Sequence, residues 1–134
     1  MFSRLAARAQ VEKYGKRDPD HEWGTNPCSE IILRPHQVCN LTEVIVRSND
    51  TLADLKRKVR LATILGTYQA TLTDFKYIRK IWKDNTEEER LLGVSLTGIL
   101  DHSILGAVSN QAERWLREMR EVANATNKQY AKRW

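Results

Sequence analysis

The sequence has few of the residues from which metal sites and disulfide frameworks are built. Its 134 residues include only two cysteines, Cys28 and Cys39, and neither a C-x-x-C nor an H-E-x-x-H pattern occurs. Even with His36 nearby, these ligands do not complete a tetrahedral zinc site at the usual spacing. The other two histidines, His21 and His102, stand alone in polar surroundings. We therefore expect no metal site, and we expect both of these histidines at the surface.

Long apolar runs are also missing. No segment approaches the roughly 18 apolar residues that a membrane span needs, and the first residues contain no apolar signal region. These absences predict a cytoplasmic protein with no membrane partner, in which a disulfide framework is unexpected. There is no internal repeat and no low-complexity tract. The length fits one domain, and 41% hydrophobic residues can supply a core.

Basic residues exceed acidic ones, 22 to 17, which gives a formal net charge of +5. They gather at residues 4–17, 56–60, 79–83 and 128–133, and these basic groups alternate along the chain with Glu and Asp. Solvated helix faces explain this pattern better than a nucleic-acid surface does, because no nucleic-acid-binding motif accompanies it. We expect no nucleic-acid partner. The excess is compatible with a nucleotide substrate but is too diffuse to assign a phosphate-binding residue.

The most informative segment is Asn26-Pro27-Cys28-Ser29-Glu30. If it is extended, the carboxamide, thiol and carboxylate at i, i+2 and i+4 point to one face, and Pro27 favours an exposed extended loop over a helix. A carboxylate raises the pKa of a neighbouring thiol, so the pair suits a cysteine that carries a hydrogen atom better than one that acts as a thiolate. The alternative is a simple turn with a buried cysteine.

Six segments in succession carry a family resemblance. They are G-T-N-P-C-S-E-I-I-L-R-P at 24–35, C-N-L-T-E-V at 39–44, K-V-R-L-A-T at 58–63, G-T-Y-Q at 66–69, L-T-D-F-K-Y at 72–77 and L-L-G-V-S-L-T-G at 91–98. The order of these segments, over residues 1 to about 103, resembles the radical-cysteine region of ribonucleotide reductases. The short gap between the two cysteines resembles the class II branch, which depends on adenosylcobalamin.

The resemblance implies a role for each matching residue. Cys28 matches the cysteine that becomes a thiyl radical and removes the 3′ hydrogen of the ribose, and Glu30 matches the general base for the 3′-hydroxyl. Asn26 matches the amide that binds the ribose hydroxyls. Cys39 matches one of the redox-active cysteines that supply two electrons. The implied cofactor is adenosylcobalamin, with no assigned contacts, and the implied reductant is thioredoxin-like.

The same resemblance implies the fold and the function. Relatives fold as a ten-stranded α/β barrel several times longer than this chain, so residues 1–134 are expected to form a partial barrel segment with the radical-cysteine loop at 24–30. The whole enzyme converts ribonucleoside di- or triphosphates to 2′-deoxyribonucleotides for DNA synthesis. We expect the chain to need the remaining segments of the reductase and to be inactive alone. The alternative is a non-catalytic remnant or interaction module from a truncated or split gene.

The apolar pattern predicts a mostly helical α/β chain with about three short strands. The expected helices cover residues 3–14, 52–70, 72–83 and 109–132, and the expected strands cover 31–33, 38–47 and 91–96. The run Ile31–Leu33 is continuously apolar, which is typical of a strand buried on both faces. Thr51 is the expected N-cap of the helix at 52–70. Residues 87–90 are expected to form a charged connection.

Overall fold

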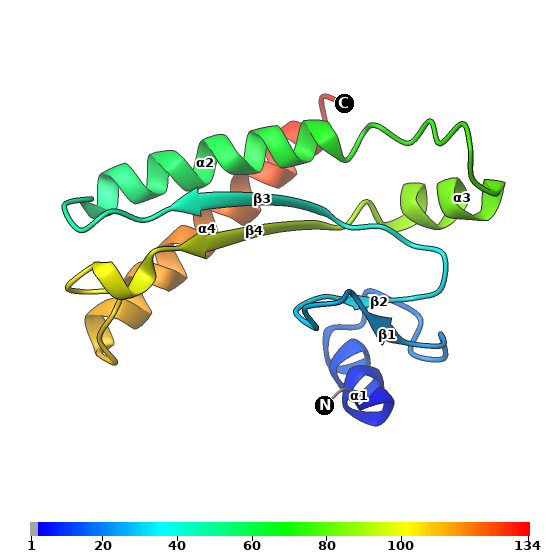
Figure 1. Ribbon diagram of the computed structural model, residues 1–134, viewed down its shortest axis with the longest axis horizontal. Coiled ribbons are helices and arrows are strands. Elements are labelled where there is room, and N and C mark those ends of the chain that lie inside the picture. The colour runs from blue at the N-terminus through cyan, green and yellow to red at the C-terminus, as the bar shows by residue number, and fades with distance from the viewer. Residues whose placement is uncertain (1–2) are drawn as a thin grey trace. The chain divides into compact units, whose positions relative to one another are not determined.

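The computed structural model describes residues 3–134 and divides them into two compact units (Figure 1). Unit 1 contains residues 3–39 and Thr73–Glu89, and unit 2 contains Asn40–Leu72 and Arg90–Trp134. The chain therefore leaves unit 1 after Cys39, returns to it at Thr73 and leaves it again after Glu89. No helix among residues 3–134 is long and apolar enough to cross a membrane.

Unit 1 consists of two helices and a small hairpin. Its elements are α1 (Arg4–Tyr14), β1 (Gly24–Thr25), β2 (Ile32–Leu33) and α3 (Lys80–Glu89). The Ser3 hydroxyl caps α1 by accepting the Ala6 N–H, and Gly15 ends the helix at φ 59°, a left-handed conformation that glycine adopts without strain. The buried apolar core of this unit contains only Ala7, Val11 and Trp23, with Ile32 partly buried against them.

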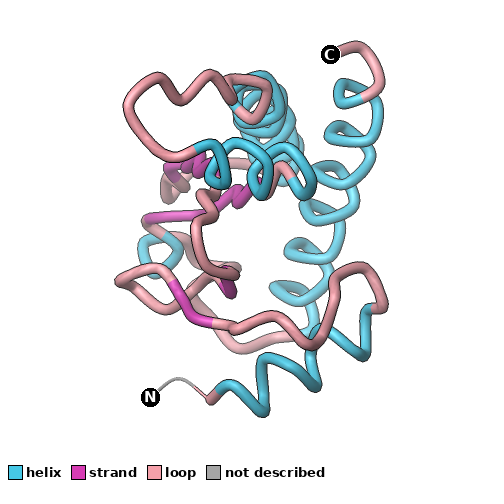
Figure 2. Tube along the Cα trace, turned by 90° about the vertical axis from the view of Figure 1, so that its right-hand side faces the viewer, coloured by secondary structure: helices cyan, strands magenta, loops and turns pink. Residues whose placement is uncertain are grey.

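Unit 2 is a two-stranded parallel sheet packed against two long helices (Figures 1 and 2). Its elements are β3 (Asn40–Ile45), α2 (Leu52–Gln69), β4 (Leu92–Thr97), the short 3-10 helix η1 (Ile99–Asp101) and α4 (Asn110–Ala131). Helix α2 contacts both strands, and α4 lies beside α2. The buried core joins the strands to both helices; its members are Val44, Val46, Leu55, Val59, Leu105, Trp115 and Met119.

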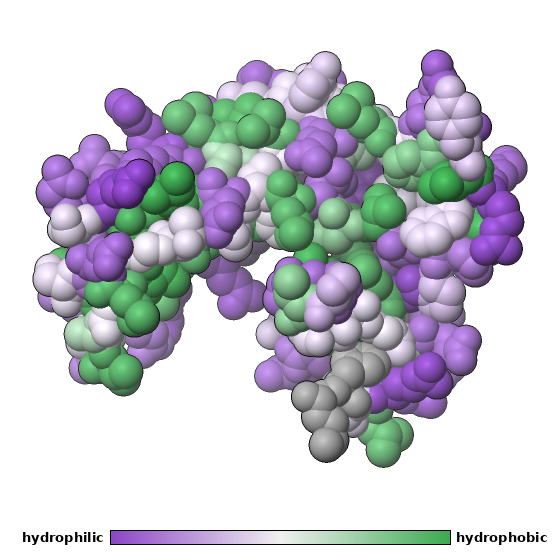
Figure 3. Space-filling model, in the orientation of Figure 1, coloured by the Kyte–Doolittle hydropathy of each residue, from purple (hydrophilic) through white to green (hydrophobic). Residues whose placement is uncertain are grey.

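The two faces of the sheet in unit 2 differ in burial. Thr42 and Val44 of β3 are buried, opposite Val94 and Leu96 of β4, whereas the alternate residues of β3 are exposed. The outer edge of β3 has no partner strand among residues 3–134. An open groove of about 550 Å³ follows β3 and is lined by Ile45, Leu61 and Leu65 among others. Figure 3 shows apolar side chains over α2 and β3 on this face of the molecule.

Most of the predicted elements are confirmed, with ends that move by no more than two residues. The helices predicted at 3–14, 52–70 and 109–132 correspond to α1, α2 and α4, and the strands at 38–47 and 91–96 correspond to β3 and β4. The strand at 31–33 shrinks to Ile32–Leu33. The expectation that it is buried on both faces is wrong: both residues are half-buried, because β2 pairs only with β1 in an antiparallel hairpin.

The helix predicted at 72–83 is wrong. Helix α3 begins at Lys80 and continues through the expected charged connection to Glu89. The spacing of Phe75, Ile78 and Ile81 is helical, but Ile78 and Ile81 are exposed, so this stripe has no core to face. The segment instead turns after Gln69, and the Thr73 hydroxyl donates a hydrogen bond to Glu87 Oε1 (2.6 Å).

Candidate active site

The hairpin of unit 1 holds residues 26–31 in a closed loop. Thr25 of β1 pairs with Ile32 of β2, so both ends of the loop are fixed by the same pair. Inside the loop, the Ser29 N–H donates to the Asn26 carbonyl (3.0 Å), and the Asn26 N–H donates to the Ile31 carbonyl (3.4 Å). Ser29 has a φ of 65°, in the left-handed region that non-glycine residues rarely adopt.

The thiol and the carboxylate of the loop are both exposed. Cys28 and Glu30 lie on a turn that starts at Pro27, and neither is in a strand. The extended conformation considered for this segment is therefore wrong, because Ser29 reverses the chain where a strand would continue. The alternative of a turn with a buried cysteine is wrong about the burial. An exposed sulfur next to an exposed carboxylate can meet a ligand from outside the chain.

Asn26 has a structural task in the loop. Its side-chain Oδ1 accepts the Ile31 N–H at 3.1 Å, which closes the loop from the side opposite the turn. The oxygen is therefore in use, and the two N–H donors of the carboxamide are the groups able to bind an oxygen of a ligand. The carboxamide predicted to bind a substrate hydroxyl can do so as a donor while it shapes the loop.

Cys39 lies at the end of unit 1, half-buried, directly before β3. Along the chain, β2 and the buried residues Arg34 and Gln37 stand between Cys39 and the loop. The two cysteines thus differ in setting, since Cys28 is on an exposed loop and Cys39 is at a junction.

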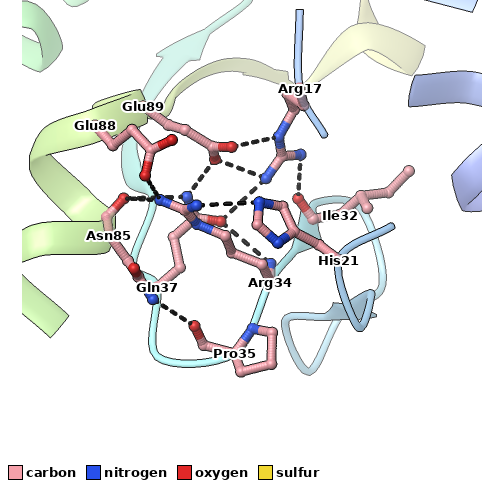
Figure 4. A network of polar contacts seen from close by, with 9 residues as sticks. All are labelled: Arg17, His21, Ile32, Arg34, Pro35, Gln37, Asn85, Glu88 and Glu89. Atoms are coloured by element: carbon pink, nitrogen blue, oxygen red, sulfur yellow. Dashed lines mark hydrogen bonds and ion pairs between the residues drawn. The ribbon is translucent and has the colours of Figure 1, made fainter. Parts of the chain in front are cut away.

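Behind the hairpin, a network of polar side chains joins β2 to α3 (Figure 4). The Arg17 guanidinium donates from Nε to Glu89 Oε1 (2.9 Å) and from Nη2 to Glu89 Oε2 (2.7 Å). Its Nη1 donates to the Ile32 carbonyl (2.9 Å), and Nη2 also donates to Gln37 Oε1 (3.0 Å). Gln37 Nε2 donates to Glu89 as well. One arginine therefore holds the strand that follows the loop and the carboxylate that ends α3.

A second arginine, Arg34, is more deeply buried, with 6% of its surface exposed. Its Nη2 donates to Glu88 Oε2 (2.6 Å) and to the Asn85 carbonyl (3.0 Å), and its Nη1 contacts His21 Nε2 (3.1 Å). Its Nε is buried and has no hydrogen-bond partner. The Arg34 side chain is thus a second link to α3, and its carboxylate partner is largely in solvent.

The electrostatics of the network favour an ionised Glu89. Burial disfavours the charged carboxylate and acts to raise the pKa, but the hydrogen bonds from Arg17 and Gln37 outweigh it, so the pKa of Glu89 lies below its ordinary value. The carboxylate is therefore charged at neutral pH and pairs with Arg17 over two parallel hydrogen bonds, the strong geometry for an arginine and a carboxylate.

The sequence pattern did not single out Arg17, Gln37 or Glu89. Arg17 and Glu89 are 72 residues apart, and no short motif or period connects them. The one local signal was the position of Arg34 after an apolar run, where a charged residue marks the end of a strand. These residues form a supporting layer behind the loop and do not lie on it.

The histidines lie apart from one another in the described part of the chain, and one of them is not where the sequence pattern predicts it. No group of three or more potential ligands occurs among residues 3–134. His102, expected at the surface, is buried with 3% exposure, so this expectation is wrong. Its Nε2 donates to the Asp50 carbonyl (2.9 Å), and its Nδ1 accepts the N–H groups of Ile104 and Leu105. Both ring nitrogens are therefore occupied by the backbone, which makes His102 a structural residue of unit 2.

Among the curated relatives are three proteins named adenosylcobalamin-dependent ribonucleoside-triphosphate reductase. The one from Lacticaseibacillus paracasei is 37% identical over 101 residues, 75% of this chain and 12% of the relative. Those from Lactobacillus helveticus and Lactobacillus acidophilus are 36% identical over 63% of this chain and 33% identical over 68%. The matched region spans 11% and 12% of these two relatives. No protein-family model and no solved structure matches the chain.

Proposed function

We propose, from the confirmed relationship of this chain to adenosylcobalamin-dependent ribonucleoside-triphosphate reductases, that it is the radical-cysteine segment of such an enzyme. The observation that carries the proposal is the exposed loop in which Asn26, Cys28 and Glu30 occur together. The enzyme would convert ribonucleotides to 2′-deoxyribonucleotides. Because the chain spans about 12% of the first relative, it would act together with the remaining segments and be inactive alone.

The relatives are named for adenosylcobalamin, and the loop suits an encounter with a large cofactor. Cys28 is exposed on a turn, so a bulky group can approach its sulfur without displacing the core of unit 1. When bound, the cofactor supplies the one-electron chemistry that removes the hydrogen atom from the Cys28 thiol. We assign no residue of this chain to the corrin ring, so that contact would come from the remaining segments.

The residues of the loop would divide the chemistry among them. The Cys28 sulfur, after losing its hydrogen atom, takes the 3′ hydrogen of the ribose, and the S–H bond re-forms as the C–H bond breaks. Glu30 accepts the proton of the 3′-hydroxyl, which promotes departure of the protonated 2′-hydroxyl as water. The N–H donors of Asn26 would hold a ribose oxygen in place, since the Asn26 side-chain oxygen is occupied by Ile31.

Reduction of the substrate needs two electrons from outside the loop. Cys39 and a second cysteine in the remaining segments would supply them together with two protons, and their thiols would be oxidised to a disulfide. Cys28 finally returns the 3′ hydrogen to the product. A thioredoxin-like dithiol would reduce the disulfide after each turnover. The overall balance is one ribonucleotide and two thiols giving one deoxyribonucleotide, one disulfide and one water.

Unit 2 would supply part of the barrel wall. Its parallel strands β3 and β4, with α2 packed on both, have the composition of a β–α–β unit, the building block of α/β barrels. The open outer edge of β3 is where a further strand of a ten-stranded barrel could pair. We propose that this strand comes from the remaining segments of the reductase.

The role of Glu30 is tested by Glu30→Gln in the enzyme assembled from this chain and the remaining segments. Glutamine keeps the size of the side chain but cannot accept the proton, so turnover should fall by roughly 10²–10⁴-fold. The control is Glu22→Gln, an exposed carboxylate of the same unit that pairs with Arg4; it should leave turnover unchanged. Near-normal turnover of Glu30→Gln across the pH range would rule out Glu30 as the base.

The roles of the two cysteines are distinguished by two measurements on each variant. One is hydrogen exchange from the cofactor, and the other is the yield of deoxynucleotide. Cys28→Ser should abolish both, because an alcohol O–H bond is too strong to replace the thiol. Cys39→Ser should keep the exchange and block multiple turnovers. If Cys28→Ser retains exchange, or Cys39→Ser turns over normally, the assignments are wrong. If the assembled wild-type chain shows neither activity, the chain is a non-catalytic remnant.

A further inference from the structure

We propose that Arg17, Gln37 and Glu89 form a clamp that positions the Asn26–Glu30 loop for its chemistry. This inference deepens the proposed function and rests on it for the identity of the reaction. Arg17 hydrogen-bonds the carbonyl of Ile32, the residue directly after the closed loop at 26–31. The clamp residues act through β2, the strand that follows the loop, and are therefore positioning residues.

The geometry of Arg17 carries the proposal. Its guanidinium uses two nitrogens on Glu89 and the third on the Ile32 carbonyl. Ile32 is the hairpin partner of Thr25, the residue directly before the loop. Because Ile32 and Thr25 close the loop from both sides, a donor that fixes the Ile32 carbonyl fixes both ends of the segment. Three directional bonds from one rigid planar group leave little freedom in the position of β2.

The burial of the pair strengthens the effect. The side chains of Arg17 and Glu89 are 18% and 12% exposed, so water competes little for their hydrogen bonds. Arg17 also lies over the ring of Trp23, with its guanidinium carbon 4.3 Å from the ring centroid. Trp23 directly precedes β1 and belongs to the small core of the unit. The same arginine therefore contacts the chain on both sides of the loop.

Apolar packing offers little else to hold α3 against the hairpin. The only buried residue of α3 is Thr86, and none of its apolar residues belongs to the core of unit 1. Hydrogen bonds link α3 to the hairpin region, between Glu89 and both Arg17 and Gln37 and between Arg34 and both Asn85 and Glu88, while Trp82 of α3 makes an edge-on ring contact with His36. The Glu89 side chain is only 12% exposed and bonds both Arg17 and Gln37, whereas the Glu88 side chain is 66% exposed. Glu88 therefore provides a matched control on the same helix.

The first experiment measures amide hydrogen exchange in the full chain, which needs no enzymatic activity. The reporters are the N–H groups of Asn26, Ser29 and Ile31, which are hydrogen-bonded within the loop. Glu89→Gln should speed their exchange on the order of tenfold, because one charged acceptor of the clamp is lost. Glu88→Gln should speed the exchange of these loop amides less, because the Glu88 side chain is 66% exposed. Neither variant should change the exchange of the α2 and α4 amides. Unchanged loop exchange in Glu89→Gln would overturn the proposal.

A second pair of variants separates positioning from simple stabilisation. Exchanging the two residues, Arg17→Glu with Glu89→Arg, restores the opposite charges but leaves position 17 without a donor for the Ile32 carbonyl. Thermal stability should recover relative to Arg17→Glu alone, while exchange of the loop amides stays fast. Arg17→Lys keeps one donor and should give intermediate protection. If the double variant restores loop protection together with stability, the pair is only a structural link and the clamp is wrong.

Turnover of the assembled reductase then distinguishes a failure of the clamp from a failure of the proposed function. If the wild-type assembly shows no cobalamin-dependent turnover while Glu89→Gln loosens the loop, the clamp stands and the reductase assignment fails. If the wild-type assembly is active, Glu89→Gln should lower kcat several-fold, with a smaller change for Glu88→Gln. Normal kcat in a variant whose loop exchanges rapidly would overturn the clamp as a positioning device.

Discussion

Each of the two units is stabilised internally by a different kind of contact. In unit 2, a cluster of large apolar side chains from β3, α2 and α4 is buried, with Leu55 fully inaccessible to solvent. In unit 1, the apolar core is three residues and the hairpin is tied to α3 by charged and amide groups. The candidate catalytic residues Asn26, Cys28 and Glu30 all lie in unit 1. The proposed chemistry therefore lies on the unit that depends on directional contacts.

This difference has a physical explanation. Hydrophobic burial is proportional to area and has little directional preference, so it holds elements together without fixing an exposed loop to within an ångström. Hydrogen bonds to charged groups are short and directional, and a bidentate arginine fixes both distance and orientation. A loop that must present a thiol and a carboxylate gains more from the second kind of contact. The cost is sensitivity to pH and to the loss of a single partner.

The largest effect should come from the apolar core of unit 2. Leu55→Ala removes a side chain that is 0% exposed, and the cavity should destabilise unit 2 by about 2–5 kcal/mol. Amide exchange of α2 and α4 measures the loss. Leu61→Ala, on the same helix but 56% exposed, is the matched control and should cost far less. Equal effects of the two variants would contradict the core assigned to this unit.

The next effect concerns the charged contacts of unit 1 and their response to acid. Glu89 has a lowered pKa when folded, so it binds fewer protons in the folded than in the unfolded chain as the pH falls. Its stabilisation is complete above the ordinary glutamate pKa of about 4.3 and is lost as the pH drops through the lower folded value. Loop protection in unit 1 should fall in this range before the exchange of α4 amides increases.

Glu89→Gln sharpens the same comparison at neutral pH. The variant leaves the Arg17 guanidinium without its charged partner and should destabilise unit 1 by about 1–3 kcal/mol. It should also remove most of the acid dependence of loop protection, because the titrating group is gone. An unchanged acid profile would assign the pH response to another carboxylate.

A helix cap should have a smaller and local effect. The Thr51 hydroxyl accepts the Asp54 N–H (3.2 Å), and the Asp54 carboxylate accepts the Thr51 N–H (3.0 Å), so the two residues form a capping box at the start of α2. Thr51→Ala should destabilise unit 2 by about 1 kcal/mol. Ser48→Ala, an exposed residue three positions earlier, should stay within about 0.5 kcal/mol of the wild type. Chemical denaturation of both variants provides the comparison.

The ease of prediction from sequence also differs between the units. In unit 2 the elements follow from local signals: alternating burial in β3, the Thr51 cap and the apolar stripe of α4. In unit 1 the helix at 72–83 was misplaced because its apolar stripe has no core to cover. Tertiary polar contacts decided the outcome there, and the pair of Arg17 and Glu89 leaves no periodic trace in the sequence.

The candidate site shows the same limit. The residue types of the loop were enough to propose a chemistry for it, because a thiol and a carboxylate two residues apart are an unusual combination. Its conformation was not predictable, since the left-handed Ser29 and the bond from Ile31 to the Asn26 side chain depend on the hairpin around them. The residues that support the loop could not be predicted from sequence for a different reason. They come together only after the chain has returned to unit 1 from unit 2.

The smallest expected effect concerns exposed ion pairs. It tests whether the difference in stability between the units comes from the Arg17–Glu89 contacts or from ion pairs in general. Each unit has an exposed i,i+4 pair: Arg8 with Glu12 in α1, and Glu113 with Arg117 in α4. Glu12→Gln and Glu113→Gln should each cost only about 0.2–0.5 kcal/mol. The loss should be slightly larger for Glu113, which precedes its arginine and so matches the helix dipole. Chemical denaturation at low and high salt measures both. Glu12→Gln could instead destabilise unit 1 as much as Glu89→Gln does. Unit 1 would then depend on polar contacts over its whole surface and not on the Arg17–Glu89 pair in particular. Equal small losses in the two units would instead locate the difference in the buried contacts of Arg17 and Glu89.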